Sequence, residues 1–140
     1  MILKQVLYRQ TAMPVIEKSL DAAMLRDKAI ANNLANVQTP AYKRIDVSFE
    51  ESLKKALDAK RPKGTKTDDR HMSVGKPEIN EIMPMGYRAE DKTLPGEINN
   101  VDIDLEMAKM ADNQLKFFFS TKFMSNYMDD FSDIIKGRIR

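Results

Sequence analysis

The stretch AIANNLANVQTPAYKR, from Ala29 to Arg44, determines how the first helix of this chain ends. An apolar helical pattern runs into three asparagines, Asn32, Asn33 and Asn36, and stops before a Thr-Pro pair. Proline disfavours helical angles at the residue before it, so the helix should end ahead of that pair. Asparagine often ends helices, but polar side chains beside an apolar seam also fix register and partner choice. Three asparagines in this position favour the second interpretation.

Upstream of the asparagines, apolar residues repeat with the spacing of a coiled-coil seam. The intervals between them are four, three, seven, four and three residues, and Asp27 fills the vacant slot. Pro14 suits a first helical turn, where its missing N–H costs nothing. The pattern predicts a helix over residues 14–37, with a seam made of Ile16, Leu20, Ala23, Ile30, Leu34 and Val37.

The middle of the chain has weaker signals. Ser48-Phe49-Glu50-Glu51 reads as a capping box, and Phe49, Leu53 and Leu57 repeat every four residues, which predicts a short helix ending near Pro62. Residues 61–98 are rich in glycine and proline, and their first half is basic. We expect irregular structure there, with room for short strands over 78–83 and 85–88.

A second long helix is predicted near the C-terminus. Asp102 can cap it, and Asp104 and Glu106 then lie in its first turn, where the helix dipole favours negative charge. The helix should run to about Ile135. Its first apolar face, which we expect to complete the seam, consists of Leu105, Ala108, Leu115 and Phe118.

Together these elements predict a mainly α fold, in which long N- and C-terminal helices pair as an antiparallel coiled coil. Residues 1–44 and 99–140 would form that unit, and residues 45–98 would add the short helix and the irregular, partly β middle segment. An isolated pair of helices is marginally stable. The C-terminal helix also carries more apolar side chains than one partner can cover, so we expect it to contact other chains.

The composition argues against most kinds of chemistry. The chain has 140 residues, no cysteine, one histidine (His71) and a net charge of +2. A lone histidine is a poor metal site, and no glycine-rich phosphate loop occurs. The sequence therefore predicts no enzyme activity, cofactor, metal, small-molecule substrate or nucleic acid. We also expect no cleavable signal peptide, and no apolar run in the sequence is long enough to span a membrane.

The opening stretch resembles the N-terminal signature of the bacterial flagellar rod and hook axial proteins, Ala-x-Asn-[Leu/Ile]-Ala-Asn-x-x-Thr-Pro-Gly-Tyr-Lys. Ala41 stands where that signature has glycine. The block from Asn99 to Phe117 is similar to the end of the short, proximal rod proteins of this family, and Ile45–Leu53 matches a further element loosely. The signature positions present here are Ala31, Asn33, Leu34, Ala35, Asn36, Thr39, Pro40, Tyr42 and Lys43.

The resemblance implies a structural subunit of the basal-body rod, on the periplasmic side of the inner membrane, exported by the flagellar type III apparatus without a cleaved signal. Its partners would be other rod proteins, the rod–ring adaptor, the membrane ring, the export gate and further copies of itself. Asn32, Asn33, Asn36 and Tyr42 are the candidates for register and subunit contacts. Two alternatives stay open. One is a coiled-coil adaptor for a soluble partner, and the other is a protein that binds membrane or nucleic-acid surfaces through the basic run Lys54–Lys76.

Overall fold

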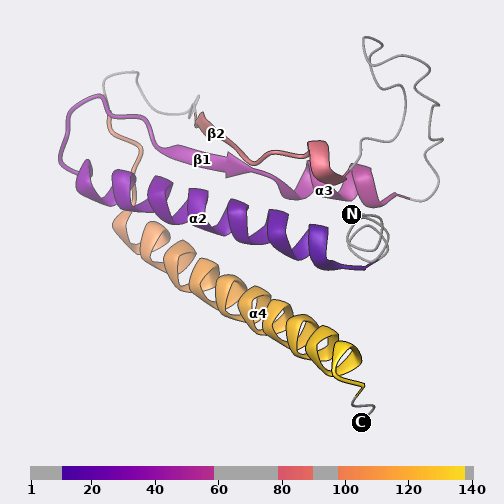
Figure 1. Ribbon diagram of the computed structural model, residues 1–140. Coiled ribbons are helices and arrows are strands. Elements are labelled where there is room, and N and C mark those ends of the chain that lie inside the picture. The colour runs from indigo at the N-terminus through magenta and orange to yellow at the C-terminus, as the bar shows by residue number, and fades with distance from the viewer. Residues whose placement is uncertain (1–10, 59–78, 90–97, 138–140) are drawn as a thin grey trace, which may run out of the picture.

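The structure, a computed structural model, describes residues 11–58, 79–89 and 98–137. Two long helices, α2 (Met13–Ala35) and α4 (Ile103–Ile135), pack against each other and run antiparallel. Figure 1 shows α2 between α4 on one side and a layer of two strands and a short helix on the other. The mainly α fold with paired terminal helices is therefore confirmed. His71 and most of the basic run Lys54–Lys76 lie outside the described residues.

Helix α2 begins and ends close to the predicted limits. Pro14 lies in its first turn, and the N–H of Asn36 closes the last turn on the carbonyls of Asn32 and Asn33. The face that α2 buries contains Ala22, Ala23, Ala29, Ile30 and Asn33. Most of these side chains are small, so neighbouring elements approach the helix backbone closely.

Two short strands form an antiparallel pair beside α2. Strand β1 (Ile45–Ser48) pairs with β2 (Met85–Arg88), and Ile45 lies opposite Arg88. The predicted strand over 85–88 is confirmed. The one over 78–83 is wrong, because Ile79–Glu81 forms a single 3-10 turn, η1. Strand β1 was not predicted: its four residues, Ile-Asp-Val-Ser, do alternate, but the run is short and leads directly into the residues read as a capping box.

The short helix α3 (Glu50–Leu57) lies directly after β1. Its N-cap is Phe49 rather than Ser48, and no side chain caps it, so the predicted capping box does not form. Ser48 is instead the last residue of β1 and is held in the strand ladder. Phe49 is buried and anchors a small cluster that holds α3 and η1 against α2, made of Ala22, Phe49, Ala56 and Ile82 with Leu53 and Ile79.

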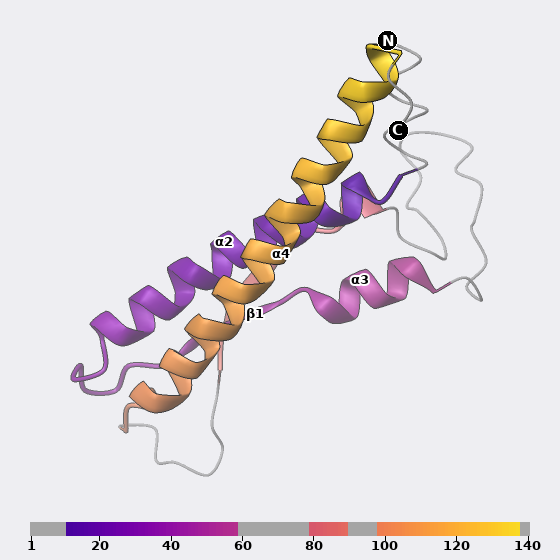
Figure 2. The same cartoon turned by 90° about the horizontal axis from the view of Figure 1, so that it is seen from below.

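Helix α4 begins as the sequence predicts. The Asp102 carboxylate accepts from the backbone N–H groups of Asp104 and Leu105, at 2.9 and 3.3 Å. The helix has 33 residues against 23 in α2, so it is longer by about 15 Å. Figure 2 shows α4 crossing α2 and continuing past it. Within the described residues, no helix combines the length and apolar composition that crossing a membrane requires.

Candidate functional site

The side chain of Asn33 lies at the centre of a polar cluster that joins the two ends of the chain. Asn33 is fully buried. Its amide donates to the carbonyl of Ile45 at 2.9 Å, and its oxygen accepts from the Ile45 N–H at 2.8 Å. One carboxamide thereby pairs with both backbone groups of Ile45, as a neighbouring strand would. The same oxygen accepts from the Tyr42 hydroxyl at 3.2 Å.

The Asn33 amide also donates to Glu106 of α4, at 2.9 Å. Glu106 is completely buried, which is unusual for a carboxylate and requires partners. Its second oxygen accepts from Lys109 at 3.1 Å, and Lys109 continues to Asp46 of β1 at 2.9 Å. Arg44 pairs with the other oxygen of Asp46 at 2.8 Å. This chain of alternating charges connects α2, β1 and α4.

Two asparagines just before α4 bind the loop that follows α2. The Asn99 amide lies 2.8, 2.9 and 3.0 Å from the carbonyls of Asn36, Val37 and Thr39. These carbonyls follow the last residue of α2, Ala35, so Asn99 holds the turn that leaves the helix. Asn100 accepts from the Arg44 N–H at 2.7 Å and donates to the carbonyl of Ala89 at 2.8 Å, which extends the strand pair by one step.

We call this group of residues the polar clasp: Asn33, Tyr42, Arg44, Asp46, Asn99, Asn100, Glu106 and Lys109. It joins the residues after the first helix to those that begin the last, over 73 positions of sequence between Asn33 and Glu106. Asn113, one heptad after Glu106, adds a second polar contact between α2 and α4 by donating to the carbonyl of Ala23 at 2.9 Å.

The remaining residues of the predicted signature lie around the clasp. Asn36 donates to the Asn32 carbonyl at 2.8 Å and accepts from Thr39 at 3.2 Å, which closes the end of α2. Lys43 donates to the carbonyl of Ile98 at 3.1 Å. Leu34 is half-buried, whereas Asn32, Ala35 and Pro40 are exposed. Of the three asparagines at the end of α2, Asn32 is thus the exposed one.

Ala41 adopts the left-handed conformation, with φ of 57°. This is a conformation that glycine adopts readily, whereas an L-residue in this region is strained by about 1–2 kcal/mol. The hydrogen bonds made by Thr39 and Tyr42 on either side hold the turn in place.

The residues predicted for the seam differ in burial between the N-terminal part of the chain and α4. Ala23 and Ile30 are buried and Ile16, Leu20, Leu34 and Val37 are half-buried. On α4 the prediction of intrachain pairing is wrong, because the four residues assigned to it are exposed: Leu105, Ala108, Leu115 and Phe118. The face of α4 turned toward α2 carries Glu106 and Asn113 instead. Leu115 lies nine residues after Glu106, about 180° around the helix.

The sequence reasoning missed Glu106, Lys109, Asp46 and Asn113. Glu106 was explained by helix-start electrostatics alone, and the clasp shows that it also has a buried partner. One signal was available, because Asn33 lies three residues after Ile30 on the same helix face as the seam. A buried asparagine predicts a polar partner on the opposite helix.

Among the described residues, no group of three or more His, Cys, Asp or Glu side chains could hold a metal ion.

Comparison with known proteins identifies the family. No protein-family model matches the chain. Relatives with the name "Flagellar basal body rod protein FlgB" do match it. The protein from Bacillus subtilis is 32% identical over 123 residues, which cover 87% of this chain and 91% of the relative. That from Borreliella burgdorferi is 31% identical over 121 residues, covering 84% and 90%. The chain belongs to the FlgB family of flagellar basal body rod proteins.

The similarity to FlgB extends well beyond the N-terminal signature. A match that covers 84% of 140 residues leaves about 22 residues outside, so it includes both Asn33 and Glu106. The FlgB of Salmonella typhimurium is 28% identical over 130 residues and covers 86% of this chain. The resemblance to the flagellar rod proteins, inferred from the signature and the Asn99–Phe117 block, is therefore confirmed.

Proposed function

We propose that this chain is a structural, non-catalytic subunit of the rod of the bacterial flagellar basal body. Its FlgB relatives are named as rod proteins. One observation on the chain itself supports the same role: helix α4 exposes apolar side chains over most of its length and around much of its circumference.

Helix α4 exposes more large apolar side chains than a protein that acts alone would be expected to expose. Leu115 and Phe118 are 59% and 63% exposed, although both are large apolar side chains. Large apolar side chains gathered on an exposed surface mark interaction surfaces. The exposed apolar residues of α4 are Ile103, Leu105, Met107, Leu115, Phe117, Phe118, Phe119, Phe123, Met128, Ile134 and Ile135.

The polar clasp would fix the direction in which the exposed apolar side chains of α4 point. Because hydrogen bonds and ion pairs fix α4 against α2 and β1, the apolar side chains of α4 are held in one orientation for neighbouring subunits. The residues predicted as an intrachain seam, Leu105, Leu115 and Phe118, would then form a seam between subunits. Asn32 would contact a neighbour from the outer surface of α2.

In this proposal the chain is exported through the flagellar type III apparatus and assembles on the periplasmic side of the inner membrane. Its helices pack with those of other rod proteins and further copies of itself. It would link the membrane ring, the rod–ring adaptor and the export gate to the rod that transmits torque.

The test is to locate the chain and to remove it. A strain lacking the gene should be non-motile and should lack rods in purified basal bodies, and an epitope-tagged chain should restore both and copurify with the rod. A motile deletion strain with complete rods would contradict the proposal. The adaptor alternative predicts instead a discrete soluble complex that is absent from basal bodies.

A further inference from the structure

The face of α4 turned away from α2 carries a regular repeat that is open to solvent. Among the described elements, α4 packs chiefly against α2, and Figure 1 shows the strands and α3 lying beyond α2. Six residues of this outer face are separated by four, three, four, three and four positions, which is the repeat of a coiled coil. All six are exposed. We call them the outer seam: Asp104, Ala108, Ala111, Leu115, Phe118 and Lys122.

The outer seam changes in charge and in side-chain size from one end to the other. Asp104 is acidic at its start and Lys122 is basic at its end, and among the described residues neither side chain has an ion-pair partner. Between them, two alanines are followed by Leu115 and Phe118, which are 59% and 63% exposed. A face with coiled-coil spacing and this much exposed apolar surface fits a second helix. The order of charge and size indicates which helix that is.

The outer seam is complementary to itself when two α4 helices run in opposite directions. Each small residue then faces a large one, so the side chains interdigitate. Each end of the seam also faces the opposite charge, which favours this orientation. The three pairs, each formed twice, are Asp104 with Lys122, Ala108 with Phe118, and Ala111 with Leu115.

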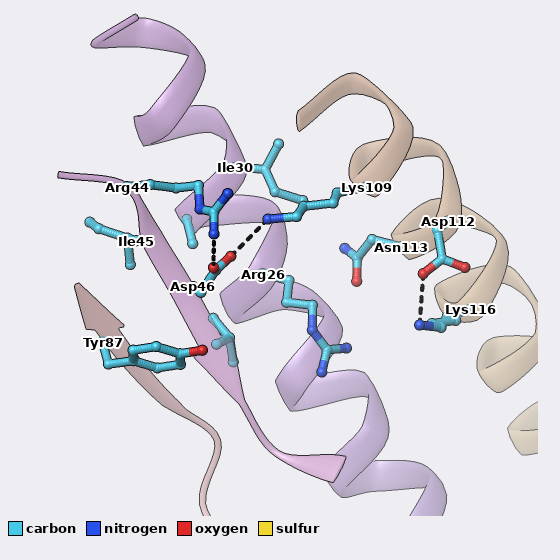
Figure 3. A pocket seen from close by; sticks show the side chains of 12 residues that line it. Arg26, Ile30, Arg44, Ile45, Asp46, Tyr87, Lys109, Asp112, Asn113 and Lys116 are labelled. Carbon is cyan, nitrogen blue, oxygen red and sulfur yellow. Dashed lines mark hydrogen bonds and ion pairs between the residues drawn. The ribbon is translucent and has the colours of Figure 1, made fainter. Parts of the chain in front are cut away.

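A parallel pair of α4 helices lacks this complementarity. Like residues would meet along the seam, so Asp104 would face a second carboxylate and Phe118 a second large ring, while facing alanines would leave a gap. One like-charged contact is present in the antiparallel pair, because Asp112 lies beside the middle of the seam. Figure 3 shows Asp112 paired with Lys116 of its own helix, at 2.7 Å, which offsets that repulsion.

We propose that two copies of the free chain pair through their outer seams as an antiparallel, two-fold dimer. The contact runs from Asp104 to Lys122, about 27 Å along α4. A two-fold contact is closed and does not extend into a filament. It also covers Leu115 and Phe118, which the proposed function assigns to neighbouring rod subunits. The dimer therefore keeps the free chain from assembling until the two copies separate, and only this consequence rests on the proposed function.

Sedimentation equilibrium of the purified full chain tests the dimer and its end charges. We expect a reversible monomer–dimer equilibrium between about 10 and 500 µM. Lys122→Asp should weaken the dimer about tenfold, because two ion pairs become two repulsive contacts. Adding Asp104→Lys to that variant should restore most of the loss. The matched control, Lys28→Asp at an exposed lysine of α2, should leave the equilibrium unchanged. Equal weakening by the control and the seam variant would contradict the pairing.

Introduced cysteines report the orientation, because the chain has none of its own. Asp104→Cys combined with Lys122→Cys should give a covalent dimer on oxidation and nothing larger. A bridge within one chain is excluded, because the two positions are about 27 Å apart. Asp104→Cys alone is the control, since its two cysteines lie at opposite ends of an antiparallel dimer and should not bridge. A bridged dimer of this single variant, or a ladder of larger products from the double variant, would overturn the inference.

The dimer and the proposed function fail separately in these experiments. A wild-type chain that stays monomeric up to about 500 µM overturns the dimer, whether or not the chain is found in basal bodies. A chain that dimerises as expected but is absent from basal bodies overturns the proposed function and leaves the dimer in place.

Discussion

Replacing Asn33 by alanine tests whether the polar clasp holds the two chain ends together. The substitution removes the partner of the Ile45 N–H, the Ile45 carbonyl, the Tyr42 hydroxyl and one oxygen of Glu106. The two Ile45 groups lose about 1 kcal/mol each, and the buried carboxylate loses about 2 kcal/mol. Tyr42 is half-buried and can turn to solvent, so its loss is small. Alanine gains about 0.5 kcal/mol in helix propensity. The net destabilisation is therefore about 3–4 kcal/mol.

The neighbouring Asn32 supplies the matched control. It is an asparagine on the same helix, but it is exposed and lies outside the clasp. Asn32→Ala changes the same atoms and gains the same helix propensity, so its stability should equal or slightly exceed that of the wild type. Any difference between the two variants measures the buried contacts rather than the loss of an amide.

The assay is urea unfolding of the purified chain, followed by circular dichroism at 222 nm. With a slope of about 2 kcal/mol per molar urea, a loss of 3–4 kcal/mol lowers the midpoint by about 2 M. A small domain is stable by only about 5–15 kcal/mol, so this is a large part of the total. If the midpoint of Asn33→Ala falls within about 0.5 M of that of Asn32→Ala, the clasp contributes little and the reasoning is wrong.

Four further substitutions, the first with a matched control, test separate parts of the structure. Ala41→Gly should stabilise the chain by about 0.5–1 kcal/mol, because it relieves the left-handed strain at some entropic cost. As a control, Ala31→Gly at an exposed position inside α2 should destabilise the chain by about 1 kcal/mol. Thermal unfolding of the two variants and the wild type measures both effects. Asp102→Ala should cost about 1 kcal/mol by removing the N-cap of α4, again read from melting. Leu34→Asp should abolish rod incorporation, and normal motility in that variant would refute the seam assignment on α2. Leu115→Gln should change the stability of the isolated chain by less than about 0.5 kcal/mol yet reduce motility, and full motility would show that the exposed face of α4 is not a subunit contact.

The long helices could be predicted because their signals are local and repeated. The α2 seam recurs over several turns, Pro14 and the Thr-Pro pair mark its limits, and Asp102 caps α4 through its own neighbours. Strand β1 could not be found in this way. Its four residues are stabilised by β2, about 40 positions away, and by the side chain of Asn33, and neither contact leaves a periodic pattern.

The face of α4 that meets α2 was misassigned for a related reason. The prediction paired the apolar stripe of α2 with the apolar stripe of α4, as the hydrophobic effect suggests for a two-helix protein. Here the inner face of α4 carries Glu106 and Asn113, and the apolar residues lie outside. A single sequence does not distinguish an apolar face that pairs within the chain from one that pairs with another chain. The buried position of Asn33 on the seam of α2 was the available clue that the opposing residue is polar.

A polar contact between α2 and α4 also fixes their register in a way that an apolar seam would not. Apolar residues at heptad spacing can slide by seven positions and still bury similar surface. If α4 slid by one heptad, Asn113 would replace Glu106 beside Asn33, Lys109 would lose Asp46 of β1, and Asn99 would leave the carbonyls that follow α2. Each loss leaves a polar group without its partner, which is costly where the group is buried, as Asn33 and Glu106 are. A subunit with exposed apolar faces has many non-native pairings available, and the clasp restricts the chain to the one in which both ends of the sequence meet.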